Sequence, residues 1–224
     1  MANQAFVSVW CTDFPADQIV NRLDMFLATI PFSAVRPGID RVLIRAIDAS
    51  ESPVVEQDFR AAPLEIAGVI DLIAGHVHSD CAYEFRCYCD SWLFDSDHAK
   101  FSLEPQPVEI LCHGENYDNG VWIENGHFQV CLGFEHLFTG HARLLGSSRR
   151  ESAPAVSREE ARFLEAMAWP ENFERYQEKT RENIRRLLDW SQRMANAVPV
   201  RRLSLWSEGE ENFEARLDEI LAPS

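Results

Sequence analysis

The stretch VWIENGHFQVCLGF, from Val121 to Phe134, decides the fold that this sequence predicts. Asn125-Gly126 supplies the two residues that a tight type I′ turn needs at positive φ. Segments rich in β-branched and aromatic residues flank this pair on both sides, as is typical of the two strands of a hairpin. We therefore expect an antiparallel β-hairpin over this stretch.

The expected hairpin has an apolar and a polar face, because successive side chains of a strand point to opposite sides. With a two-residue turn, Glu124 faces His127 and Trp122 faces Gln129. These four residues share the polar face with Cys131, and we interpret them as a candidate ligand-binding surface without catalysis. The apolar face, which we expect in the core, consists of Val121, Ile123, Phe128, Val130, Leu132 and Phe134.

The composition is that of an ordinary globular chain with a strongly acidic balance. The 224 residues are 46% hydrophobic and 25% charged, so the chain can bury a sizeable core. An excess of acidic residues gives a formal net charge of −15. This charge makes nucleic acids and anionic membranes poor partners, and it favours a basic protein surface, a cation or simply solubility.

The sequence shows neither a secretion signal nor a membrane-spanning segment. Residues 1–9 lack the basic and apolar pattern of a leader, and the most apolar stretch, 64–74, is too short to span a bilayer. We therefore expect a cytoplasmic protein whose six cysteines stay reduced and serve mostly as small core residues. They are Cys11, Cys81, Cys87, Cys89, Cys112 and Cys131.

Strands and helices alternate in the N-terminal part of the chain. Their order is strand, helix, strand, strand, helix, strand, which is the order of a ferredoxin-like split βαβ unit. A β-meander that contains the hairpin is expected to follow. The expected strands are 6–11, 41–48, 54–59, 83–94 and 108–113, and the expected helices are about 15–30 and 63–74.

The composition changes at 146–156, GSSRRESAPAV, which indicates a linker or exposed loop. Residues 1–145 are expected to form an α+β domain with an antiparallel-rich sheet. Residues 157–224 are expected to be mainly helical, with a terminal strand-helix unit, and to pack on that domain. A capping box at Ser157 opens the first helix of this segment, and Pro170 opens a long one.

The first and last expected strands resemble one another. SVWCTDFPADQIVNRLDMFL, from Ser8, and SLWSEGEENFEARLDEIL, from Ser204, both combine a strand ending in Trp, an acidic turn and a helix containing Arg-Leu-Asp. Chance similarity between two amphipathic units is our preferred explanation. If the similarity reflects a repeat, the last strand belongs to the same sheet as the first.

The candidate metal site is the stretch from His76 to Cys81. In an extended conformation His76, His78 and Asp80 project to one side, and two imidazoles with a carboxylate suffice to bind a divalent transition metal. His113 could join them from a neighbouring strand. The alternative is that His76 interacts with a helix C-terminus and that His78 is a surface residue.

Two other groups could carry chemistry. Cys11 lies just before a helix N-terminus, a location that can stabilise a thiolate, although the neighbouring Asp13 opposes it. Glu124 and His127 could form a general base with its orienting carboxylate. An exposed ion pair is the alternative for that couple.

These observations favour a non-catalytic binding or protein-interaction module, with a basic protein surface as the expected partner. The alternative is a metal-dependent hydrolase that uses His76, His78, Asp80 and His113. Neither a Walker loop nor a dinucleotide-binding glycine motif occurs in the sequence, so nucleotide binding of those kinds is unsupported.

Overall fold

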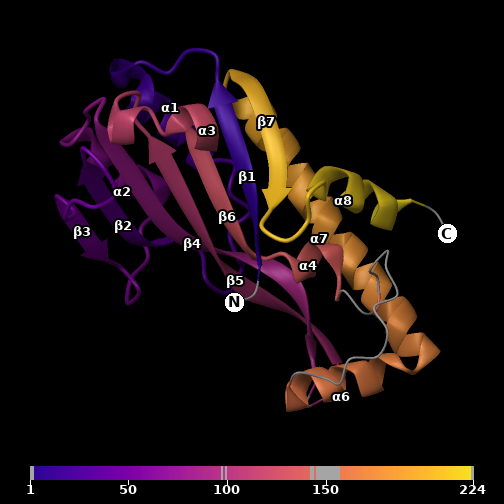
Figure 1. Ribbon diagram of the computed structural model, residues 1–224. Coiled ribbons are helices and arrows are strands. Elements are labelled where there is room, and N and C mark those ends of the chain that lie inside the picture. Colours follow the sequence, from indigo (N-terminus) through magenta and orange to yellow (C-terminus); the bar gives the residue numbers. More distant parts are fainter. Residues whose placement is uncertain (1–2, 97, 99, 142–143, 145–156, 223–224) are drawn as a thin grey trace.

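The computed structural model describes residues 3–96, 98, 100–141, 144 and 157–222. Its centre is one seven-stranded antiparallel sheet with the order β3-β2-β4-β5-β6-β1-β7 (Figure 1). Helices pack against this sheet, so the α+β class with an antiparallel-rich sheet is confirmed. The strands are β1 (Gln4–Cys11), β2 (Ile39–Ala46), β3 (Val55–Asp58), β4 (Cys81–Asp95), β5 (Lys100–His113), β6 (Phe128–Phe134) and β7 (Val200–Ser207).

The helices that supply core residues are α1 (Ile19–Leu27), α2 (Ile66–Ala74), α4 (His136–Thr139), α7 (Pro170–Ala197) and α8 (Phe213–Leu221). The other helices are α3 (Trp122–Asn125) and α6 (Arg158–Met167), with short 3-10 turns at Ala16–Gln18 and Tyr117–Asn119. Figure 1 shows the long α7 running from α6 past β7, which is the edge strand on that side of the sheet. None of the helices in the described ranges has the length and apolar character needed to cross a bilayer.

The strand order does not confirm the ferredoxin-like prediction. A split βαβ unit places its first strand beside other strands of the same unit. Here β1 pairs with β6 and β7, while β2 pairs with β3 and β4. The order of elements along the chain is therefore as expected up to β4, but β1 lies at the far side of the sheet.

The predicted hairpin at Val121–Phe134 is wrong in its first half. Only β6 is a strand, and the residues before Gly126 form the short helix α3. The reason is that β5 and β1 occupy both edges of β6, so no edge remains for a hairpin partner. Ile123, expected in the core, is 64% exposed, and Phe134, at the end of β6, is 45% exposed. The other half of the prediction holds, because Phe128 and its alternating neighbours in β6 are buried.

Glycine is needed at position 126 because of a close contact with the backbone of β1, not because of the type I′ turn that the sequence predicts. The φ of Gly126 is +92°, and a Cβ atom added there would lie 2.9 Å from the backbone N and O atoms of Val9. Glycine is thus required where β1 passes directly over the end of α3.

The core lies between the sheet and α1, α2, α7 and α8. Phe26 of α1 stacks on Phe128 of β6 at 4.1 Å between ring centroids. The indole N–H of Trp190 in α7 donates to Thr29 Oγ1 at 3.0 Å, and both residues are buried. Helix α7, from the C-terminal segment, therefore shares one core with α1 and the residues that follow it.

The β4–β5 ladder is longer than the sequence predicts and reaches from Ala82–His113 to Asp95–Lys100. Pro105 and Pro107 lie in this extension, beyond the Glu109–Cys112 stretch in which β5 also pairs with β6. Proline is tolerated where a strand has a free edge. Buried Asn183 of α7 holds this extension, since its side chain accepts from Trp92 N at 2.8 Å and donates to Trp92 O at 3.1 Å.

The C-terminal segment matches the local signals in its sequence. Ser157 caps α6 by accepting from Glu160 N at 3.0 Å, and Pro170 is in the first turn of α7. The expected linker at 146–156 lies outside the described residues. β7 pairs with β1 along Ala5–Ser207 to Cys11–Val200, so the last strand does lie in the same sheet as the first.

We expect Trp190→Phe to lower the free energy of unfolding by about 1–3 kcal/mol, because it removes a buried hydrogen bond and leaves unfilled volume. Urea denaturation measures this loss, and a double-mutant cycle with Thr29→Val should give a coupling of about 1 kcal/mol. Trp169→Phe, at a site 69% exposed, is the matched control and should change stability by less than about 0.5 kcal/mol. Equal stability of the Trp190→Phe protein and the wild type would contradict the shared core.

Candidate functional site

The structure does not assemble the predicted metal site. His76, His78 and Asp80 are exposed in the turn between α2 and β4. His113 is 3% exposed, and its Nδ1 lies 2.9 Å from the carbonyl oxygen of Gly126. Within the ranges that the structure describes, no group of three or more His, Cys, Asp or Glu side chains is arranged to hold a metal ion. The metal hypothesis therefore gains no support.

Of the four predicted ligand-binding residues, Trp122 and His127 come together. Their rings stack with centroids 4.3 Å apart and planes at 15°. Glu124 is exposed on α3, and Gln129 is half-buried in β6, opposite Ser8 of β1 and Leu111 of β5. The contact between Trp122 and His127 arises from the fold of α3 back over the sheet, not from cross-strand pairing.

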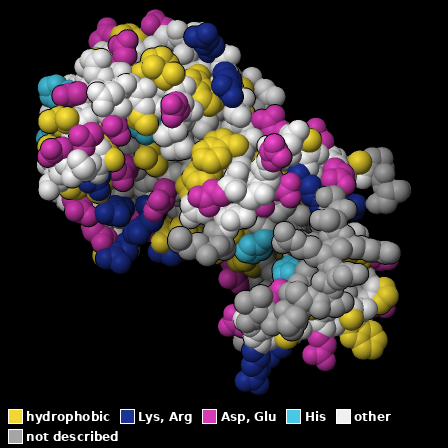
Figure 2. Space-filling view, in the orientation of Figure 1, with side chains coloured by type: hydrophobic (Ala, Val, Ile, Leu, Met, Phe, Trp, Pro, Cys, Tyr) yellow, Lys and Arg dark blue, Asp and Glu magenta, His cyan; other side chains and the backbone are white. Residues whose placement is uncertain are grey.

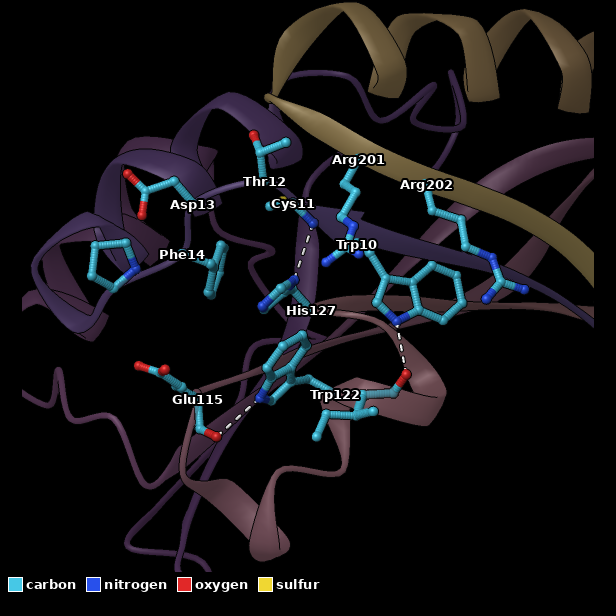
Figure 3. A pocket seen from close by; sticks show the side chains of 12 residues that line it. Trp10, Cys11, Thr12, Asp13, Phe14, Glu115, Trp122, His127, Arg201 and Arg202 are labelled. Carbon is cyan, nitrogen blue, oxygen red and sulfur yellow. Dashed lines mark hydrogen bonds between the residues drawn. The ribbon is translucent and has the colours of Figure 1, made fainter.

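Trp122 and His127 line an open pocket of about 640 Å³ at the end of β1, β6 and β7 (Figure 3). Its other walls are Trp10 and Phe14 from the β1 side, and Arg201 and Arg202 from β7. Asp13 and Glu115 lie at the rim opposite the arginines. The pocket thus combines aromatic walls with two basic and two acidic groups.

Hydrogen bonds to the backbone fix the aromatic walls. The indole N–H of Trp10 donates to the carbonyl oxygen of Ile123, and that of Trp122 donates to the carbonyl oxygen of Glu115, each at 3.0 Å. The backbone N–H of Cys11 donates to Nδ1 of His127 at 3.0 Å. Because these polar atoms are already satisfied, the rings are held in place before any ligand arrives.

His127 is neutral in this environment. It is 4% exposed and lies between Trp122 and Phe14, whose ring centroid is 4.6 Å away. Burial, with a smaller effect of His113, lowers the pKa of His127 to about 4. Because Nδ1 accepts the Cys11 hydrogen bond, the proton of the neutral ring is on Nε2. A base this weak does not suit general base catalysis near neutral pH.

Cys11 does not have the properties of a nucleophile. It is 4% exposed, and burial raises the pKa of its thiol to about 12, only partly offset by Arg22. The thiol therefore stays protonated at neutral pH, whereas nucleophilic cysteines need a lowered pKa. The sequence-based hypothesis of a thiolate at this position is not supported.

A β-bulge in β7 brings both arginines to the pocket. Trp10 pairs with Arg202 and Cys11 pairs with Val200, so Arg201 is an extra residue without a partner in the ladder. Such a residue changes the direction of neighbouring side chains and lets two consecutive ones approach the same site.

Trp10, Phe14, Arg201 and Arg202 were not predicted as site residues. The resemblance between the two strand-helix units was the one signal that connected them, because it suggested that the first and last strands share a sheet. The bulge itself leaves no pattern in the sequence. No protein-family model, curated protein or solved structure matches this chain.

We expect the stability of the protein to fall as the pH decreases from about 6.5 towards 4. Between these values the unfolded chain binds a proton at His127 and the folded chain does not, so acid favours unfolding. Burial lowers the pKa of His113 as well, which adds to the effect. Each such group contributes a slope of roughly 1.4 kcal/mol per pH unit within its window.

Urea denaturation at several pH values measures this slope. His127→Asn keeps an oxygen that can accept the Cys11 hydrogen bond but cannot be protonated, so it should flatten the pH dependence. His78→Asn, at an exposed position, is the control and should leave the slope unchanged. An unchanged slope in the His127→Asn protein would contradict the buried neutral histidine.

Proposed function

We propose that this protein is a non-catalytic binding protein whose small organic ligand occupies the pocket between Trp10, Trp122 and β7. The observation that carries the proposal is the set of aromatic rings held by backbone hydrogen bonds around an open space. Its volume of about 640 Å³ is within the range typical of small-molecule sites. A preformed site loses little conformational entropy on binding, which favours affinity.

The chemistry of the lining supports binding without catalysis. The pKa of about 4 for His127 and of about 12 for Cys11 leaves neither group suited to act as base or nucleophile at neutral pH. All six cysteines are unpaired thiols. Free thiols are characteristic of reducing compartments, so we propose the cytoplasm as the location.

Ligand binding should depend on Trp122. We expect a fragment library of mono- and bicyclic aromatic compounds, screened by saturation-transfer NMR, to yield compounds that bind the wild type. Trp122→Ala should weaken their binding about tenfold or more, since it removes a stacking surface, while Trp122→Phe keeps a ring and should retain part of the affinity.

Trp169→Ala is the matched control for this experiment. Trp169 is 69% exposed and does not line the pocket, so its replacement should leave binding unchanged. Circular dichroism establishes that each variant is folded. A wild type that binds none of the fragments, or fragments that bind equally well to the Trp122→Ala protein, would refute the proposal.

A second candidate function, association with a basic protein surface, is favoured by the charge. Acidic side chains are spread over the face seen in Figure 2. In the sequence, the segment Glu208–Glu219 alone contains six acidic residues. Three of these have partners within the protein: Glu208 accepts from Gln4 N, Glu214 accepts from Leu205 N, and Glu219 pairs with Arg216. Glu211 and Asp218 are exposed and are better placed to meet a partner.

If this second candidate is correct, a pull-down from lysate of the producing cell at low salt should recover a specific basic protein. Salt screens exposed charges, so the same protein should be lost at about 0.5 M salt. The double variant Glu211→Gln/Asp218→Asn should recover less of it. Glu171→Gln/Glu174→Gln, at the N-terminal end of α7 and outside the Glu208–Glu219 segment, is the control. Recovery that is insensitive to salt would contradict an electrostatic interface.

A further inference from the structure

The two arginines of β7 are placed differently from other arginines of the sheet. On β2 and β4, Arg45 pairs with Glu84 at 3.0 Å and Arg86 pairs with Asp40 at 2.7 Å. Among the ion pairs of the described ranges, none includes Arg201 or Arg202. The other arginines of the strands, Arg41, Arg45 and Arg86, each have an acidic partner. The charges of Arg201 and Arg202, which are exposed and line an aromatic pocket, therefore remain available to an anionic ligand.

The surroundings of Arg202 orient its charge without neutralising it. Its guanidinium carbon lies 4.4 Å from the centroid of the Trp10 ring, a cation–π contact. The Trp10 ring is in turn held by its hydrogen bond to Ile123 O. A guanidinium that is held in this way retains its N–H groups for a carboxylate or phosphate, which it can bind through two parallel hydrogen bonds.

The remaining walls provide apolar ring surfaces. Trp122, Phe14 and the Trp10 indole line the same space as the arginines. On the opposite rim, Asp13 and Glu115 are exposed carboxylates that repel an anion from that side. The distribution of charge therefore fixes the direction in which an anionic ligand lies across the pocket (Figure 3).

We infer that the ligand is a planar aromatic molecule that carries a carboxylate or phosphate group. Its ring stacks on the Trp122 side of the pocket, and its anionic group faces the side lined by Arg201 and Arg202. This inference rests on the proposed function, because it names the class of ligand for that same pocket.

Isothermal titration calorimetry with four matched probes tests the inference. The probes are 2-naphthoate, 2-naphthyl phosphate, neutral 2-naphthalenemethanol and cationic 2-naphthylmethylammonium. At least one of the two anions should bind tenfold or more tightly than the neutral probe, and the cation should bind most weakly. A preference for naphthoate or for the phosphate identifies which anionic group the site recognises.

Variants of the arginines separate charge from ring stacking. Arg201→Gln should reduce the affinity for the anions to about that of the neutral probe, without changing the affinity for the neutral probe itself. Arg201→Lys keeps the charge but not the planar guanidinium, so it should restore part of the difference. Arg41→Gln, on the same sheet but paired with Glu56 at 2.8 Å, is the control and should have no effect.

The outcomes distinguish the inference from the proposed function. If the neutral probe binds as tightly as the anions, or if Arg201→Gln does not change anion affinity, the inference is wrong and the pocket still binds aromatic ligands. Tightest binding of the cation also overturns it. If no naphthalene probe binds, the inference fails, and the fragment screen with Trp122→Ala decides whether the proposed function fails with it.

Discussion

The pairing of β1 with β6 on one side and with β7 on the other is the constraint on which the rest of this structure depends. Together with β5 on the other edge of β6, it leaves no free edge there, so the residues before Gly126 leave the sheet and form α3. It also places Trp10 beside Arg202 and within hydrogen-bonding distance of the Ile123 carbonyl oxygen, and these contacts shape the wall of the pocket. The pairing joins segments that are far apart in the chain, and its loop-closure cost must be offset by the shared core.

Features that depend on neighbouring residues could be predicted from the sequence, and features that depend on a distant partner could not. The cap at Ser157, the start of α7 at Pro170 and the alternation of β4 follow from local sequence. The type I′ turn at Asn125-Gly126 was a reasonable local prediction, but it failed because no edge of β6 was free. In the site, Trp122 and His127 were identified by sharing a polar face, although a different geometry brings them together.

The pocket shows why its chemistry is hard to predict from residue types. A histidine beside a cysteine suggests catalysis, yet the same hydrogen bond from Cys11 N to His127 that shapes the pocket also fixes the neutral ring. Burial then lowers the pKa of the histidine and raises that of the thiol. His127 and Cys11 are therefore part of a rigid pocket wall. The exposed guanidinium groups of Arg201 and Arg202 on β7 are the groups that can recognise a ligand.

The hydrogen bond from Leu205 N to Glu214 Oε1, at 2.8 Å, has a consequence for how the molecule behaves among its own copies. β7 is the outer strand on its side of the sheet, and an outer strand offers free N–H and C=O groups to the strands of other chains. By occupying one of these N–H groups from α8, Glu214 removes a point at which a foreign strand would begin to pair. The acidic residue thus protects the β7 edge against aggregation into extended intermolecular sheets.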